Sequence, residues 1–310
     1  MKTVAYGIVP CLFIAISAAS ALAQAQRTFV SGLGNDMNPC SRTAPCRTLT
    51  QAIMGTNAGG EVIVLDSAGY GAFSIGKAIS IIAPSGVYAG ISVFSGDGID
   101  VTAGASDTVI LRGLTVNSQG GANGIVFNTG GTFHIENCVI NAFGGDGIQF
   151  NGPGKLIVRD TISRGNGFGI RTISSTGLAL VSIERCLLDK NIEAGLFVQE
   201  GTRASIRNSV ASSGNFIGVS ATPSGGSLTA ELNIDTCLIS NNIGSGSVGV
   251  SAGGFSGSAA TIRISNSTVT NNGLGLQQLM GGSILSRGNN TVEGNTTADT
   301  QGTIGTYNAK

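Results

Sequence analysis

The side chains best suited to chemistry flank a recurring Gly-apolar step. Four segments align on that step, at Gly98, Gly124, Gly147 and Gly169. Their polar residues are Asp97, Asp100, Asn123, Asp146, Gln149 and Arg171. Carboxylates, amides and a guanidinium can hydrogen-bond sugar hydroxyls, and the oxygens can hold a hard cation. We predict that these six residues form a ligand-binding face, and we assign no residue a catalytic role.

A repeat with a period of roughly 23 to 30 residues must position this face. Each period holds the Gly-apolar step and a second motif: an apolar, an outward, a turn and a small residue, as in Ile135-Glu136-Asn137-Cys138. Units this short contain no helix to cover them, so they must bury their apolar faces by stacking on one another. The repeat therefore predicts a parallel β-helix. A β-propeller or β-sandwich fits less well, because blades need four strands and sandwiches do not repeat one motif column by column.

The second motif predicts which strands pair. We expect the strands at 109–112, 133–136, 156–159, 181–184, 204–207, 232–235 and 262–265 to lie side by side in one parallel sheet. The aliphatic residues after the glycines, from Ile125 to Val250, should form a stacked inward column.

The spacing of the coils argues against a metal site. Neighbouring coils are ~4.8 Å apart, so Asp97 and Asp146 should be separated by ~9.6 Å. Ca²⁺ needs its oxygen ligands at about 2.3 to 2.6 Å. We therefore expect no metal and no other cofactor, and we interpret the two residues as isolated, exposed carboxylates. His134 is interpreted as an ordinary outward strand residue.

The outward position of the second motif alternates in charge. Its column reads Arg112, Glu136, Arg159, Glu184, Arg207, Asp235 and Ser265. Because identical charges would repel at ~4.8 Å, alternation should convert each neighbouring pair into an exposed ion pair. These charges are therefore predicted to stabilise the stack.

Two ladders and one disulfide follow from the same alignment. Asn166, Asn191, Asn242, Asn272 and Asn295 recur five residues after the small residue and should bond to each other and to turn backbone. Cys138, Cys186 and Cys237 share the small position in alternate coils, too far apart to bond, and should be reduced and buried. Cys40 and Cys46 close a short loop and are predicted to form a disulfide, since a metal site there would need two further ligands.

The first residues have the pattern of a secretory signal peptide. Met1-Lys2, an apolar stretch and Ala21-Leu22-Ala23 predict cleavage before Gln24. We divide the chain into a signal peptide (1–23), an N-terminal cap region (24–60) and the β-helix (61–310), and expect a secreted or periplasmic product with no membrane insertion after signal removal. The 17 basic and 17 acidic residues balance, which disfavours a nucleic-acid partner.

Aromatic residues that could stack on sugars are few. The chain has no Trp, and Tyr70 and Tyr88 are the candidates to line a groove. Phe127 and Phe150 occupy inward positions and are expected in the core.

The segments Phe29–Asp36 and Pro45–Ile53, with the repeats Ile135–Ile140 and Ile264–Val269, resemble the right-handed parallel β-helix proteins of the pectin-lyase-like superfamily. The resemblance implies an all-β, right-handed parallel β-helix of about ten coils with a short N-terminal helical cap. It also implies that polysaccharide-active enzymes are relatives, although their clustered acidic residues have no counterpart here.

We therefore expect an exported, non-catalytic scaffold or binding protein with an elongated face for glycan, envelope or protein contact, whose partner is a polysaccharide or cell-envelope component. The alternatives are a polysaccharide-active lyase, hydrolase or epimerase, and an adhesin passenger domain.

Overall fold

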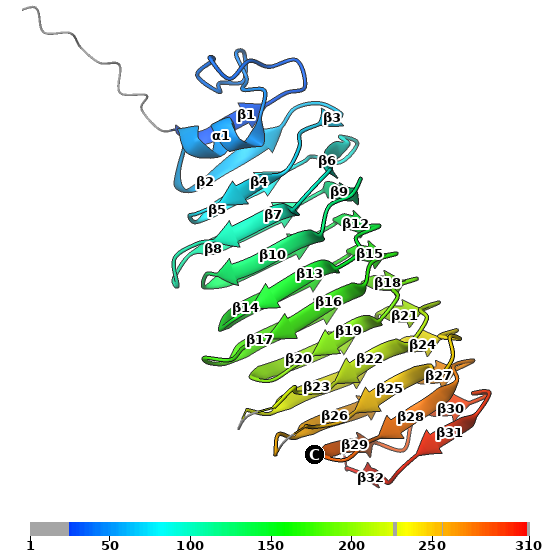
Figure 1. Cartoon of the computed structure of the whole chain (residues 1–310). Coiled ribbons are helices and arrows are strands. Elements are labelled where there is room, and N and C mark those ends of the chain that lie inside the picture. Colours follow the sequence, from blue (N-terminus) through cyan, green and yellow to red (C-terminus); the bar gives the residue numbers. More distant parts are fainter. Residues whose placement is uncertain (1–24, 226–227, 256, 309–310) are drawn as a thin grey trace, which may run out of the picture.

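A computed structural model describes residues 25–225, 228–255 and 257–308. The expected signal peptide lies outside these residues. Three parallel sheets, which we name A, B and C, wind around one core, with a single helix at the N-terminal end of the described chain (Figure 1). The predicted right-handed parallel β-helix with a helical cap is confirmed. No helix in the described residues is long and apolar enough to cross a membrane.

Sheet A contains the strands predicted from the second motif. It consists of β1 (Ala25–Val30), β2 (Thr56–Val64), β5 (Ile79–Ile82), β8 (Thr108–Arg112), β11 (Thr132–Glu136), β14 (Gly154–Arg159), β17 (Ala179–Glu184), β20 (Thr202–Arg207), β23 (Ala230–Asp235), β26 (Ala260–Ser265), β29 (Gly282–Ser286) and β32 (Ile304–Thr306). The strands from β8 to β26 pair in parallel in the predicted register.

Sheets B and C complete each coil. Sheet B consists of β3 (Ala68–Gly69), β6 (Ala89–Val93), β9 (Leu114–Ser118), β12 (Val139–Asn141), β15 (Ile162–Arg164), β18 (Leu187–Asp189), β21 (Val210–Ser212), β24 (Leu238–Ser240), β27 (Thr268–Thr270) and β30 (Thr291–Glu293). Sheet C consists of β4 (Phe73–Ile75), β7 (Asp97–Thr102), β10 (Asn123–Thr129), β13 (Asp146–Asn151), β16 (Phe168–Ile173), β19 (Ala194–Val198), β22 (Ile217–Ala221), β25 (Val248–Ala252), β28 (Leu274–Gln278) and β31 (Ala298–Gln301). The chain runs from A to B to C in every coil (Figure 1).

The core is built from stacked columns of inward side chains. Ile125, Ile148, Ile170, Leu196, Val219 and Val250 have no exposed surface. The Phe127 and Phe150 rings stack with centroids 4.4 Å apart. One corner of the core is polar, because the side-chain oxygens of Thr172, Ser174, Gln199 and Thr202 are buried without a hydrogen-bond partner among the described residues.

A single residue turns the chain from sheet A into sheet B. Asn137, for example, has a φ of 51°, and the equivalent residue of each later coil through Asn266 is also left-handed. Asn and Asp tolerate this conformation because their side chains bond locally, whereas Arg185 and Thr236 adopt it at some cost. The turn aligns the ends of neighbouring sheet A strands.

The N-terminal cap consists of β1 and α1 (Leu49–Gly55), packed against the first coil (Figure 1). The Thr48 hydroxyl caps α1 by accepting the Gln51 N–H at 3.2 Å. The Asp36 carboxylate accepts the N–H groups of Arg47 and Thr48 at 2.8 and 2.9 Å, and these bonds lower its pKa although burial opposes them. The predicted Cys40–Cys46 disulfide is present beside this helix.

The asparagine ladder forms as predicted. Asn166 donates its backbone N–H to the Asn191 side-chain oxygen at 3.1 Å, and Asn242 does the same to Asn272 at 3.2 Å. Asn295 continues the ladder beyond Asn272. The buried amides therefore satisfy the backbone of the turns between sheets B and C.

The cysteines alternate with hydroxyl residues along the stack. Cys138, Cys186 and Cys237 are free and buried, as predicted. The Cys186 N–H donates to the Ser209 hydroxyl of the next coil at 3.0 Å, and that hydroxyl donates to the Arg207 carbonyl at 2.7 Å. Burial raises the pKa of each thiol to about 11. The three thiols are therefore protonated and unreactive at neutral pH.

Candidate functional site

The predicted face lies on the outside of sheet C, across β7, β10, β13 and β16. Asn123 is in register with Asp97, and Asp146 occupies the same column one coil later. Gln149 is paired with Arg171, and Asp100 lies in the same column on β7, two coils before Gln149. The structure thus brings the six predicted residues onto one surface.

Four of these residues form a hydrogen-bonded chain across the coils. Asn123 donates its amide to Asp97 at 2.8 Å and accepts the Asp146 backbone N–H at 2.8 Å. The Asp146 carboxylate in turn accepts two bonds from the Arg171 guanidinium, at 2.6 and 2.8 Å. Asp100 is separate from this chain and accepts a bond from Asn128 at 2.7 Å.

Asp146 is not the exposed carboxylate that we predicted. It is only 1% exposed, because Arg171 reaches from the next coil and lies over it. Burial raises the pKa of Asp146, the negative charge of Asp97 adds to this effect, and Arg171 opposes it. The residue that faces solvent here is Arg171, whose side chain is 31% exposed.

Sequence reasoning missed the aromatic part of this surface. Phe168 follows Asp146 in its column, and Phe197 follows Arg171 in the adjacent one. The two rings lie 5.3 Å apart, and the Arg171 guanidinium sits 5.4 Å from the centre of the Phe168 ring. Extending the column alignment by one coil, to Gly195-Leu196, would have revealed Phe197.

These rings border a hollow of about 360 Å³. Phe168, Phe197 and Phe216 line its apolar part, and Glu193 and Gln277 supply polar groups. We call this the aromatic hollow. A surface that combines flat apolar rings with a few polar groups can hold a sugar, because a pyranose has an apolar C–H face and a polar edge.

The two tyrosines considered from sequence have different environments. Tyr70 is 6% exposed and donates its hydroxyl to the Asp66 carbonyl at 2.8 Å, so the prediction that it lines a groove is wrong. Burial and the Asp66 carboxylate raise the Tyr70 pKa. Tyr88 is 51% exposed, but its hydroxyl accepts a bond from Asn117 and lies outside the aromatic hollow.

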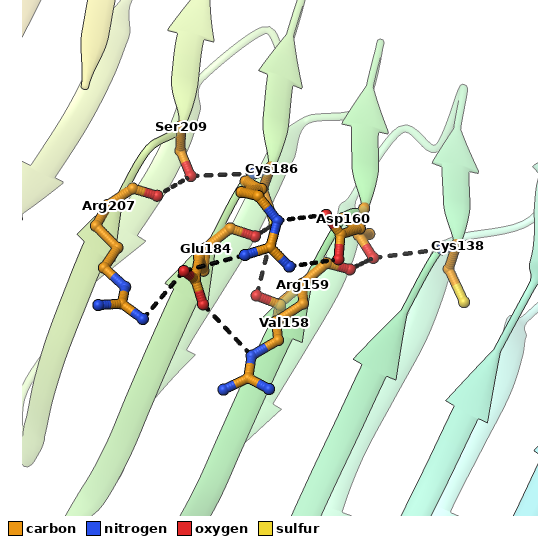
Figure 2. A network of polar contacts seen from close by, with 10 residues as sticks. Cys138, Val158, Arg159, Asp160, Glu184, Cys186, Arg207 and Ser209 are labelled. Atoms are coloured by element: carbon orange, nitrogen blue, oxygen red, sulfur yellow. Dashed lines mark hydrogen bonds and ion pairs between the residues drawn. The ribbon is translucent and has the colours of Figure 1, made fainter. Parts of the chain in front are cut away.

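The charge column lies at the ends of the sheet A strands. Three of the five neighbouring pairs that we predicted form ion pairs, whereas Glu136 with Arg159 and Arg207 with Asp235 form none among the described residues. Arg112 pairs with Glu136 at 2.5 Å, and Glu184 contacts Arg159 at 3.5 Å and Arg207 at 3.0 Å (Figure 2). The exposure of Glu184 also differs from the prediction, because its side chain is only 12% exposed. The turn residue Arg185 contacts the Glu184 carboxylate at 3.1 Å and also forms an ion pair with Asp160 at 2.7 Å.

No potential metal site emerges from this geometry. In the part of the chain that the structure describes, no three His, Cys, Asp or Glu side chains converge closely enough to hold an ion. His134 lies on the outward face of β11, between Ile110 and Ile157, and partial burial lowers its pKa.

The chain belongs to the right-handed β-helix family: the family model described as "Right handed beta helix region" matches residues 97–297. No curated protein matches the sequence significantly. The fold is similar to that of an alginate lyase from Paenibacillus sp. str. FPU-7, with a TM-score of 0.65, 15% identity, and coverage of 92% of this chain and 99% of the lyase. It is also similar to pectate lyase Pel9A, with a TM-score of 0.51, 13% identity, and coverage of 86% and 70%. At these identities the likeness concerns the fold.

Proposed function

We propose that this chain is an exported β-helix protein that binds polysaccharide on the outer face of sheet C without cleaving it. The observation that carries the proposal is the aromatic hollow beside Arg171. Phe168 and Phe197 offer ring faces, and the guanidinium offers donors to the ring oxygens and hydroxyls of a sugar. The disulfide in the cap region supports an oxidising compartment, either secreted or periplasmic.

The carboxylates on this face support binding more than catalysis. A general acid must reach within hydrogen-bonding distance of the glycosidic oxygen. Asp146 is enclosed by its ion pair, while Asp97 and Asp100 accept bonds from Asn123 and Asn128. These contacts fix the polar rim of the site.

The binding proposal is tested with a panel of neutral and acidic polysaccharides, using affinity electrophoresis and then titration calorimetry with oligosaccharides of the ones retained. Replacing Phe197 by Ala should weaken binding of neutral glycans about tenfold, since losing about 1.4 kcal/mol of contact changes Kd by that factor. Phe94→Ala is the matched control, because Phe94 is 73% exposed and lies outside the hollow. Equal affinities for both variants would refute the site.

The alternative is a polysaccharide-active enzyme, and the fold accommodates it. The proteins with similar folds are named for alginate and pectate. Incubation with those two polymers, with and without Ca²⁺, should release no unsaturated or reducing ends if the chain only binds. If the wild type cleaves either polymer and Phe197→Ala abolishes this cleavage, the surface is a catalytic site and the binding proposal is wrong.

A further inference from the structure

The outer face of sheet A carries a second hollow, across β14, β17 and β20. Three columns of outward side chains run along it. The central column reads Ile157, Ser182, Ser205 and Asn233, between a first column of Lys155, Leu180, Arg203 and Glu231 and a third of Arg159, Glu184, Arg207 and Asp235. The third column is the charge column described above, and the first was not singled out from sequence.

Short side chains between long ones create this hollow. Ser182 and Ser205 form its floor, and Lys155, Leu180 and Arg203 form one wall. The space measures about 380 Å³, and Leu180 is 40% exposed at its edge. We call it the serine trough.

The trough is basic in a chain whose net charge is zero. Among the described residues that line it, Lys155 and Arg203 are cationic and none is acidic, whereas Arg159, Glu184 and Arg207 belong to the adjoining charge column. Arg203 forms an ion pair at 3.2 Å with Glu231, which also contacts Arg263. Lys155 makes no ion pair within the described residues. The predicted face on sheet C has the opposite balance, with three carboxylates and Arg171.

We propose that the serine trough binds an acidic polysaccharide, a chain of sugar residues that carry carboxylates. Lys155 and Arg203 lie in one column, two coils apart, so two carboxylates ~9.6 Å apart along the chain can each meet a cation. Leu180 lies between them as an apolar support for a sugar ring.

The floor distinguishes a sugar from other polyanions. The hydroxyls of Ser182 and Ser205 can both donate to and accept from sugar hydroxyls. A single-stranded nucleic acid would instead use aromatic platforms for its bases, and no aromatic side chain lines the trough among the described residues. The proposal is independent of the aromatic hollow, which lies on another sheet.

Two kinds of variant test the trough, with an oligouronate of defined length as the probe in titration calorimetry at low salt. Lys155→Gln combined with Arg203→Gln removes the cations, and we expect affinity to fall at least tenfold. Ser182→Tyr fills the trough without changing charge and should abolish binding, while circular dichroism stays native because Tyr suits a half-buried, outward-facing strand position. Raising the salt concentration should weaken wild-type binding.

The controls separate this site from the proposed function. Lys190→Gln removes one positive charge at an exposed turn outside the trough and should leave oligouronate affinity unchanged. Phe197→Ala should also leave oligouronate affinity unchanged, although it should weaken the binding of neutral glycans. Absence of wild-type binding, unchanged affinity in Ser182→Tyr, or equally tight binding of poly-glutamate would each overturn the proposal.

Discussion

Replacing Glu184 by Gln should destabilise the stack while strengthening the serine trough. The Glu184 carboxylate contacts Arg207 and Arg159 of the two neighbouring coils at 3.0 and 3.5 Å (Figure 2), and the adjacent Arg185 at 3.1 Å. A neutral amide would therefore leave three guanidinium groups without their shared anion, although Arg185 keeps its ion pair with Asp160. Exposed ion pairs contribute about 0.2 to 1 kcal/mol each. Because the arginine side chains are about half exposed, we expect a total loss of about 1 to 2 kcal/mol.

Differential scanning calorimetry measures this change. A loss of this size should lower Tm by roughly 2 to 6 °C for a domain of this length, and 1 M salt should shrink the difference by screening the charges. Oligouronate affinity should rise, because Glu184 is the acidic residue of the charge column beside the trough. Glu293→Gln, at an exposed position of β30, is the control and should leave both properties unchanged. A Tm equal to that of the wild type, or a deficit that persists in high salt, would refute the electrostatic account.

Three further predictions concern the interior and the sheet C face. Ser209→Ala removes the acceptor of the buried Cys186 N–H and should cost about 1 to 3 kcal/mol in urea unfolding, with faster hydrogen exchange at that amide; unaltered exchange would contradict the ladder. Thr172→Val replaces an unpartnered buried hydroxyl by a methyl group and should raise Tm, so a lower Tm would show that the hydroxyl is satisfied. Burial raises the pKa of Asp146 in the folded state, so the stability of wild type relative to Asp146→Asn should fall as pH rises above the unfolded-state pKa of about 3.9 and level off above the folded-state pKa. A difference that does not change with pH would refute the shift.

The sequence was sufficient for the coil architecture because every repeat restates the same constraints. Inward aliphatics such as Ile125, turn residues such as Asn137 and the buried Asn166 recur in phase, so each strand could be located from several independent signals. Where the motif of one coil is degenerate, the register of the neighbouring coils still locates its strands.

The candidate site was less predictable because side-chain direction does not repeat. Alignment placed Asp146 in a column but could not show that Arg171 of the next coil would cover it. Phe168 interrupts the polar column, and only the position of its ring beside Phe197 shows that an aromatic surface begins there.

The serine trough could be recognised only by comparing the side-chain lengths of neighbouring columns on sheet A. The column of Lys155, Leu180 and Arg203 lies outside the repeated motif, so the alignment did not single it out. A trough also depends on small residues such as Ser182, which carry no signal until the lengths of their neighbours are known.

The unequal corners of the coil determine where this molecule can be diversified. The corner between sheets A and B has the same length from Ile135–Val139 to Ile264–Thr268, whereas the connection from sheet C to sheet A is longest between Ala221 and Ala230 and between Ala252 and Ala260. The corner between sheets A and B therefore carries no insertions, and the loop before Ala230 lines a hollow together with Arg203 of the trough. The connection from sheet C to sheet A is the natural position for grafting new peptide segments, because a longer loop there would reshape the binding walls while leaving the hydrogen-bond ladders of the stack untouched.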